Sequence, residues 1–154
     1  MKSAIGNSLL LTIVIIIVSA VILLFVSILS YSKAYRVKNG IIEIIERNNG
    51  YSEKDTEGNY ITEKETDNFL HQSGYKVGKN SGCTKILENK GVNEIISTNS
   101  NFNYCVGKTN SENGGSYYTV VTYVEFDFPV ISSMLSFPVS GQTKILNRNY
   151  DNLN

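Results

Sequence analysis

The chain has 154 residues, with 14 basic and 14 acidic side chains, two cysteines and one histidine. This length suits a single domain, and the balanced charge gives no electrostatic reason to expect nucleic acid as a partner. The apolar residues are concentrated at one end, since positions 3 to 32 carry no charge and are mainly Ile, Leu, Val and Phe. This asymmetry argues against a cytosolic globular protein.

The first predicted element is a transmembrane helix over residues 1–32. At about 1.5 Å per helical residue, Leu9–Leu29 alone reaches across a hydrocarbon core of about 30 Å. A cleaved secretory signal is the alternative, but its apolar region usually has only about 7 to 15 residues before a small-x-small site. Here the nearest candidate site, Ser32–Ala34, has Lys33 at its centre. We therefore expect an uncleaved membrane anchor.

An amphipathic stalk helix over residues 33–50 is predicted to continue the anchor. Its apolar residues recur at spacings of three and four: Ala34, Val37, Ile41, Ile44 and Ile45. Gly40 weakens this helix by about 1 kcal/mol without breaking it, and we expect Gly50 to close it in the left-handed conformation. The apolar stripe has two compatible interpretations. It is a core face for the following domain, or Val37, Ile41 and Ile44 form a helix-mediated assembly face with another subunit.

Two arguments about orientation disagree. Four basic residues follow the apolar segment, and the positive-inside bias would keep them in the cytoplasm: Lys33, Arg36, Lys38 and Arg47. However, Cys83 and Cys105 have no CxxC spacing and no second pair for a zinc site, which favours a disulfide in an oxidising compartment. Such a bridge would stabilise the domain by about 3 kcal/mol. Because long segments translocate largely regardless of nearby charge, we predict an extracytoplasmic domain over residues 51–146 and a disordered tail over 147–154.

The first part of this domain is polar. An acidic run over 53–58 superficially resembles a calcium loop, but the twelfth position from Glu53 holds Lys64 instead of a bidentate Glu, so we expect no metal there. Thr62 and Glu65 form a capping box that predicts a helix over 63–72, ended by Gly74, with Phe69 and Leu70 buried. The only histidine, His71, is expected at the surface near the end of this helix.

The clearest strand signal covers residues 117–128. Its even positions form an apolar row, and its odd positions are predicted to face water or a second, more polar layer. Residues 102–107 alternate in the same way, and the turn residues around Asn113–Gly115 predict an antiparallel hairpin between the two segments. We expect one or two helical turns at 130–135 and a last strand over 139–146, in which Val139, Thr143 and Ile145 share the side of Gly141. Residues 83–97 are ambiguous: Val92, Ile95 and Ile96 suit a short helix, and a strand over 85–88 is the other possibility.

Together these elements predict an α+β fold, with a long transmembrane and stalk helix packed on a small antiparallel sheet domain. This plan resembles type IV pilin-like proteins. More specifically, the chain resembles TadE-like pseudopilins, the minor subunits of tight-adherence pilus systems. Residues 34–42 are similar to the segment that follows their membrane helix. Four short motifs are similar to their carboxy-terminal part: Tyr104-Cys105-Val106, Tyr117-Tyr118-x-Val120, Phe126-x-Phe128-Pro129-Val130-Ile131 and Val139-x-Gly141-x-Thr143-Lys144. The resemblance implies a non-catalytic structural or assembly subunit with its soluble domain outside the membrane.

One position departs from the pilin pattern. Pilin-like proteins usually carry a glutamate five residues after the glycine at which a peptidase cuts, and it neutralises the amino terminus of a neighbouring subunit. With Gly6 as that glycine, the corresponding residue is Leu11. Since a carboxylate in lipid is costly without a partner, its absence favours a membrane-retained accessory subunit over a major pilin.

The chemistry-bearing residues do not predict an enzyme. The sequence has no glycine-rich phosphate loop, and nucleophilic catalysis would depend on His71 alone as an imidazole base. Glu125 and Asp127 project to one strand face, as acidic residues on solvent faces often do. We therefore expect no catalytic residues, no cofactor and no metal, and as partners the lipid bilayer and other pilin-like or assembly-platform subunits. The alternative is a signal-anchored extracytoplasmic module that binds a ligand or protein through exposed tyrosines such as Tyr117 and Tyr123.

Overall fold

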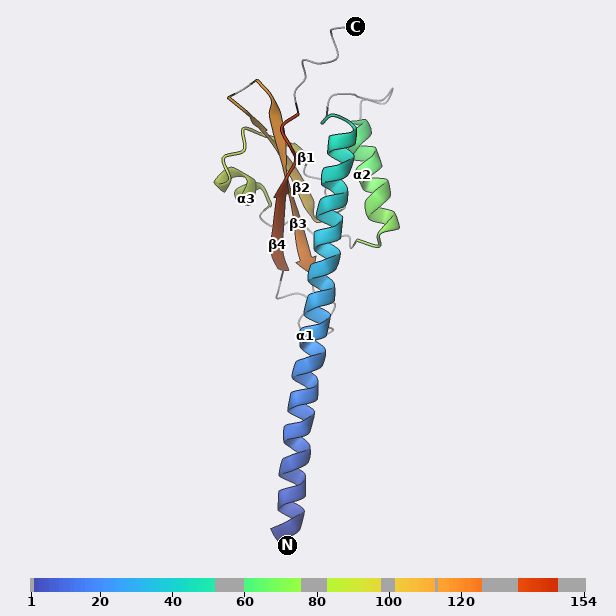
Figure 1. The fold of residues 1–154 in the computed structure, drawn as a ribbon, viewed down its shortest axis with the longest axis vertical. Helices are drawn as coiled ribbons and strands as arrows, with labels where there is room; N and C mark the ends of the chain where they lie inside the picture. The colour runs from blue at the N-terminus through green and yellow to red at the C-terminus, as the bar shows by residue number, and fades with distance from the viewer. Residues whose placement is uncertain are drawn as a thin grey trace.

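The chain forms one long helix with a small α+β domain around its carboxy-terminal part (Figure 1). The computed structural model describes residues 2–51, 60–75, 83–97, 102–112, 114–125 and 136–146. Helix α1 (Lys2–Arg47) has 46 residues, in agreement with the predicted continuous helix. It is followed by α2 (Ile61–Gln72), α3 (Cys83–Asn89), β1 (Glu94–Ser97), β2 (Tyr104–Asn110), β3 (Ser116–Glu125) and β4 (Ser136–Gln142).

The four strands form an antiparallel sheet in the order β1-β2-β3-β4. The predicted hairpin is confirmed as β2 and β3, with Val106 opposite Val120. Its turn uses Gly114 at a φ of 83°, a conformation that favours glycine. Strand β4 lies at one edge of the sheet and contains Pro138, which an edge strand tolerates because one side of its backbone has no partner strand.

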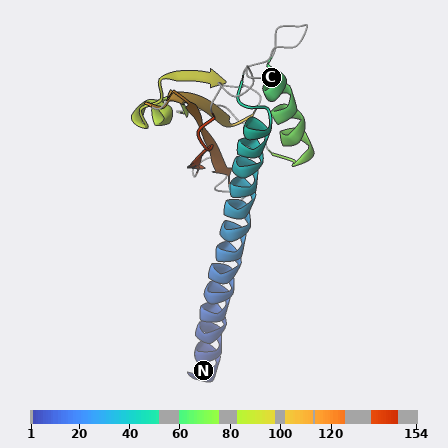
Figure 2. The same cartoon turned by 45° about the horizontal axis from the view of Figure 1, so that its top comes forward.

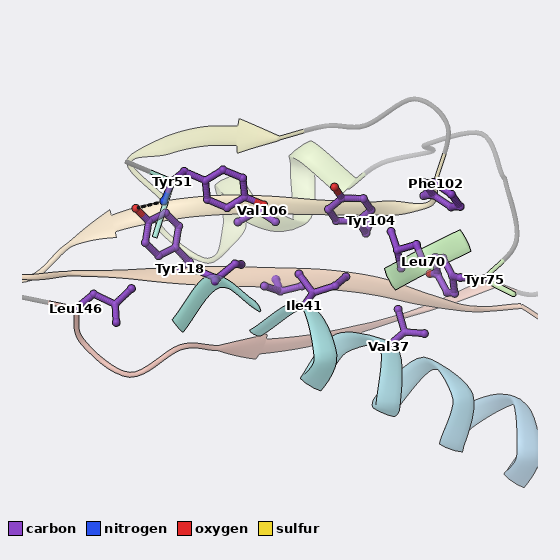
Figure 3. Packing of buried hydrophobic residues seen from close by; sticks show 12 residues of the cluster. Val37, Ile41, Tyr51, Leu70, Tyr75, Phe102, Tyr104, Val106, Tyr118 and Leu146 are labelled. Carbon is purple, nitrogen blue, oxygen red and sulfur yellow. Dashed lines mark hydrogen bonds between the residues drawn. The ribbon is translucent and has the colours of Figure 1, made fainter. Parts of the chain in front are cut away.

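The first core lies between α1, α2 and the even-numbered face of β3. Val37 and Ile41 point from α1 toward the sheet, where they meet Tyr104 and Val106 (Figure 3). Leu70 of α2 closes the same core, and its side chain is fully buried. At Gly40 the Phe69 ring lies so close that an added Cβ would be 2.3 Å from its Cζ. The glycine that weakens the isolated helix is therefore what lets α2 pack against α1.

The second core lies on the opposite face of the sheet, under α3. It contains Cys83, Leu87, Cys105, Val121 and Tyr123. The sequence predicted water or a polar layer on the odd-numbered face of β3, and this prediction was wrong. The short helix α3 and its disulfide cover that face, so β3 is buried on both sides, as its Val-rich centre allows.

All three helices end with the same backbone motif. In α1 the N–H of Gly50 donates to the carbonyl of Ile45 (2.8 Å) and that of Asn49 to Glu46 (3.3 Å). This is a Schellman motif whose left-handed residue is Asn49, with a φ of 50°. The sequence predicted Gly50 in this role, so the residue that ends the helix lies one position earlier than predicted. Gly74 ends α2 in the same way, as predicted, and Gly91 ends α3.

Two further local predictions were wrong. Helix α2 begins at Ile61 after Tyr60, so Thr62 does not cap it; the Thr62 hydroxyl instead donates to the carbonyl of Gly50 at 2.8 Å. Residues 83–97 contain a helix followed by a strand, the reverse of the expected positions, because Leu87 and the disulfide hold 83–89 against the sheet.

The last strand also differs from its prediction. Strand β4 ends at Gln142, so Thr143 and Ile145 lie beyond it; Thr143 is buried, whereas Ile145 is 51% exposed. The acidic run at 53–58, the strand residues 126–128, the predicted turns at 130–135 and the tail 147–154 lie outside the described residues.

Candidate membrane anchor and assembly surface

The amino-terminal part of α1 has no protein around it. No side chain from residue 8 to residue 33 is buried, and large apolar groups such as Leu10 (64%) and Leu29 (67%) are mostly exposed. We call residues 8–33 the bare segment. Helix α1 is long and apolar enough to cross a membrane.

Three hydroxyl groups of the bare segment are bonded within the helix. The hydroxyls of Thr12, Ser19 and Ser27 each donate to the carbonyl four residues earlier, at 3.0, 2.7 and 2.8 Å. A hydroxyl bonded in this way carries little penalty in an apolar environment. The stretch from Leu9 to Leu29 is therefore compatible with lipid.

Of the three residues predicted as an assembly face, Val37 and Ile41 lie in the first core, and Ile44 is also buried. Val37, Ile41 and Ile44 are 2%, 0% and 6% exposed, and Val37 and Ile41 pack on the sheet of their own chain (Figure 3). The core interpretation of the stripe agrees with this placement. Contact with another subunit through these side chains stays a prediction that would require the sheet to move away from α1.

An aromatic and basic collar surrounds α1 where the bare segment meets the domain. The Tyr31 and Tyr35 rings stack with centroids 6.5 Å apart, and the Lys38 ammonium lies 4.1 Å from the Tyr35 ring. Lys33 reaches across to α2, where its Nζ donates to the carbonyl of Gly74 at 2.7 Å. Tyrosine and lysine are typical of a membrane–water interface. The collar was not predicted from the sequence, although Tyr31 and Tyr35 at the end of an apolar run are a signal for it.

The domain is connected rigidly to α1. The Thr122 hydroxyl of β3 donates to the carbonyl of Ala34 at 3.3 Å. The Tyr75 hydroxyl donates to the carbonyl of Asn103 (2.9 Å) and accepts from the N–H of Tyr123 (2.9 Å), which ties the end of α2 to β2 and β3. The orientation of the domain is therefore fixed relative to the bare segment.

The predicted cysteine pair is at disulfide distance. The Cα atoms of Cys83 and Cys105 are 6.2 Å apart, within the range that a bridge spans, and the two side chains are 1% and 0% exposed. The bond joins α3 to β2 and closes the second core. Its burial makes a structural role more plausible than an exchange reaction.

The other candidate residues do not form a reactive site. His71 is exposed, as predicted, and packs edge-on against Phe102 with centroids 4.8 Å apart. Among the residues that the structure describes, no three His, Cys, Asp or Glu side chains come together as a metal site. The Glu125 side chain and Asp127 lie outside the described part.

The tyrosines proposed for ligand binding are divided between two environments. Tyr117 is partly exposed, but Tyr123 is only 4% exposed, which corrects the expectation of an exposed pair. Burial also raises the pKa of Tyr123. The pKa of Tyr51 is raised well above its usual value by burial and by the neighbouring Tyr104 and Glu63. These rings are core components.

No protein-family model, curated protein or solved structure matches the chain.

Proposed function

We propose that this protein is a membrane-anchored, non-catalytic assembly subunit that resembles a TadE-like pseudopilin, with its domain on the extracytoplasmic side. One observation carries the proposal. A single unbroken helix is bare and apolar in its first half. In its second half it packs against one face of a four-stranded antiparallel sheet (Figures 1 and 2). This is the plan expected of pilin-like subunits.

The bare segment requires a cover. Contiguous exposed apolar surface of this extent is not stable in water, and an α-helix satisfies its own backbone in lipid. Lipid and the apolar helices of other subunits are the two covers that suit it. An assembly subunit uses both, because its helix passes from the bilayer into contacts with its neighbours.

One face of the bare segment suits helix–helix contact. Thr12, Ser19 and Ser30 are separated by seven and eleven residues, which are close to whole turns, so they share one side of α1. Small residues and hydroxyl groups at such a face let helices approach closely in a membrane. The same side continues into Ala34 and Val37, which pack on the sheet. We therefore place the assembly face on the hydroxyl side of the bare segment.

Cysteine crosslinking in membranes tests this face. Both natural cysteines are paired, so an introduced thiol is the only reactive one. We expect Ser19→Cys to form disulfide-linked dimers, or crosslinks to pilus proteins, at several times the yield of Val21→Cys. Val21 is the matched control because two residues along a helix lie at almost the same depth on nearly opposite sides. Equal yields at the two positions, or no crosslink at either, would contradict assembly through this helix.

The side of the membrane is tested separately. Lys90 is exposed beside the turn that ends α3. We expect Lys90→Cys to react with a membrane-impermeant maleimide in intact cells whose outer layers are permeable to the reagent, whereas Ser19→Cys stays unlabelled. Labelling of Lys90→Cys only after lysis would place the domain in the cytoplasm.

A ligand-binding module is the second candidate, and one cleft favours it. A mainly polar cleft of about 200 Å³ lies beyond the end of α1, lined by Tyr60, Glu94, Lys108 and Tyr118 among others. A binding module would lose ligand on Lys108→Ala and show no helix-mediated crosslinks. An assembly subunit shows the crosslinks and tolerates this substitution.

A further inference from the structure

A groove opens between α1 and α2 directly beside the collar. Its volume is about 730 Å³, and its lining includes Leu29, Lys33, Arg36, Phe69 and Ser73. The two helices lie side by side (Figure 1), and the ion pair between Arg47 and Glu65 joins them at the end farther from the bare segment. Phe69 on Gly40 closes the middle, so the groove faces the bare segment.

The polar groups of the groove are arranged for an anion. Arg36 is exposed and forms no ion pair or hydrogen bond with any residue in the described part of the chain. Lys33 uses one of its three donors on the carbonyl of Gly74, which offsets the partial negative charge at the end of α2 and leaves two donors available. A guanidinium beside an ammonium is a strong arrangement for a phosphate group.

The one acidic group in the lining is far from this pair. Glu43 follows Arg36 by seven residues, which is about 10 Å along the helix axis. Leu29 supplies apolar surface at the end of the groove nearer the bare segment, whereas Phe69 closes the end beyond Arg36. The groove is therefore cationic next to an apolar strip, which matches the two chemistries of a phospholipid.

The position of the groove matches the depth of lipid headgroups. If the apolar stretch ends at Leu29, Lys33 lies about 6 Å and Arg36 about 10 Å beyond the hydrocarbon. The headgroup layer is about 5 to 8 Å thick on each side. Side chains on a helix lean toward its amino terminus, which brings the Arg36 guanidinium back toward the bilayer. Both cations therefore reach the level of lipid phosphates.

We infer that this groove binds an anionic phospholipid, with the phosphate held by Arg36 and Lys33 and the upper part of an acyl chain lying on Leu29. The inference rests on the membrane anchoring proposed above, but it does not depend on assembly into a pilus. A bound lipid would fix the depth and rotation of the rigid domain on the bilayer.

The test uses the full-length protein in neutral detergent micelles. The shift of the thermal unfolding midpoint is followed as phosphatidylglycerol is added, which gives an apparent dissociation constant. We expect Arg36→Gln to weaken this binding about tenfold, as expected for the loss of a hydrogen bond to a charged group. The matched control, Lys85→Gln with Lys90→Gln, removes two exposed cations at α3 on the other face of the sheet and should leave the affinity unchanged.

The remaining arms identify the occupant. Phosphatidylcholine should bind at least tenfold more weakly than phosphatidylglycerol, and inorganic phosphate should not shift the midpoint at the same concentration. Equal binding of both lipids, or phosphate binding as tight as the anionic lipid, would overturn the inference. The unfolding midpoint of Arg36→Gln without lipid shows whether the variant folds; if it falls, Lys33→Gln replaces it. Because the readout is lipid binding by detergent-solubilised protein, it can fail while the Ser19→Cys crosslinks succeed, and the reverse.

Discussion

The two halves of α1 are equally helical but differ in what surrounds them. In the bare segment apolar residues lie on all sides of the helix, and no side chain is buried. From Ala34 to Arg47 the apolar residues form one stripe, and Ala34, Val37, Ile41 and Ile45 are at most 2% exposed. The packed half has charged residues on its other sides, whereas residues 3 to 32 have no charge.

This difference teaches that the pattern of apolar residues, more than their number, decides what a helix packs against. A stripe can be covered by one sheet, and the charged sides remain in water. A helix that is apolar on all sides needs a cover on all sides, which a small domain cannot supply. The two halves should therefore respond differently to the same substitution.

The largest expected effect is the loss of an isoleucine from the packed half. Ile41→Ala should lower the free energy of unfolding of the domain by about 2 to 5 kcal/mol, since Ile41 is fully buried between α1 and the sheet. Ile16→Ala, at a 62% exposed position, should change it by less than about 0.5 kcal/mol. Denaturant unfolding in micelles, followed by the near-ultraviolet signal of the tyrosines, measures both. Equal losses would mean that the bare segment also packs on the domain.

Removal of the disulfide should act on the domain alone. Cys83→Ala with Cys105→Ala should cost about 3 kcal/mol of unfolding free energy, because the unfolded chain regains the entropy of the open loop. Membrane insertion, measured by resistance to carbonate extraction, should stay the same as in the parent protein. Loss of insertion would show that anchor and domain are not independent.

The end of the packed half should be sensitive to the size of one residue. Gly50 has a φ of 98°, and an added Cβ would lie 2.5 Å from the hydroxyl oxygen of Tyr118. Gly50→Ala should therefore cost about 2 kcal/mol, from backbone strain and displacement of Tyr118. Gly114→Ala is the control, because it has a φ of 83° and no atom within 4 Å of the added Cβ. It should cost about 1 kcal/mol from strain alone, and a larger loss at Gly114 would exclude the contact with Tyr118 as the cause.

The smallest expected effect is a pH dependence. The Tyr51 side chain is buried, and its pKa is raised mainly by that burial. Since the folded state resists ionisation, this contribution to stability is complete below the ordinary pKa of about 10 and falls above it, by up to about 1.4 kcal/mol per pH unit. Tyr51→Phe should flatten the stability profile above pH 10 and leave it unchanged at pH 7 to 9. An unchanged slope above pH 10 would assign the alkaline loss to other tyrosines.

The sequence predicted the elements that depend on neighbouring residues. The long helix, its end near Asn49, the end of α2 at Gly74 and the β2–β3 hairpin all follow from local periodicity and turn residues. The start of α2 was wrong because Thr62 is bonded to Gly50, which is distant in the chain. The order of helix and strand in 83–97 was wrong because a second core holds α3 in place.

The features of the candidate site also fall into those that local sequence predicts and those that depend on distant contacts. The length and apolar character of the bare segment follow from an uncharged run of Ile, Leu and Val. The single disulfide follows from the presence of two cysteines. Both can be read from composition alone. Which face of α1 the sheet covers, the burial of the odd side of β3, and the groove between α1 and α2 depend on contacts between distant segments. Periodicity shows that a face is apolar, but only the packed chain determines whether its own sheet, a second subunit or lipid covers it.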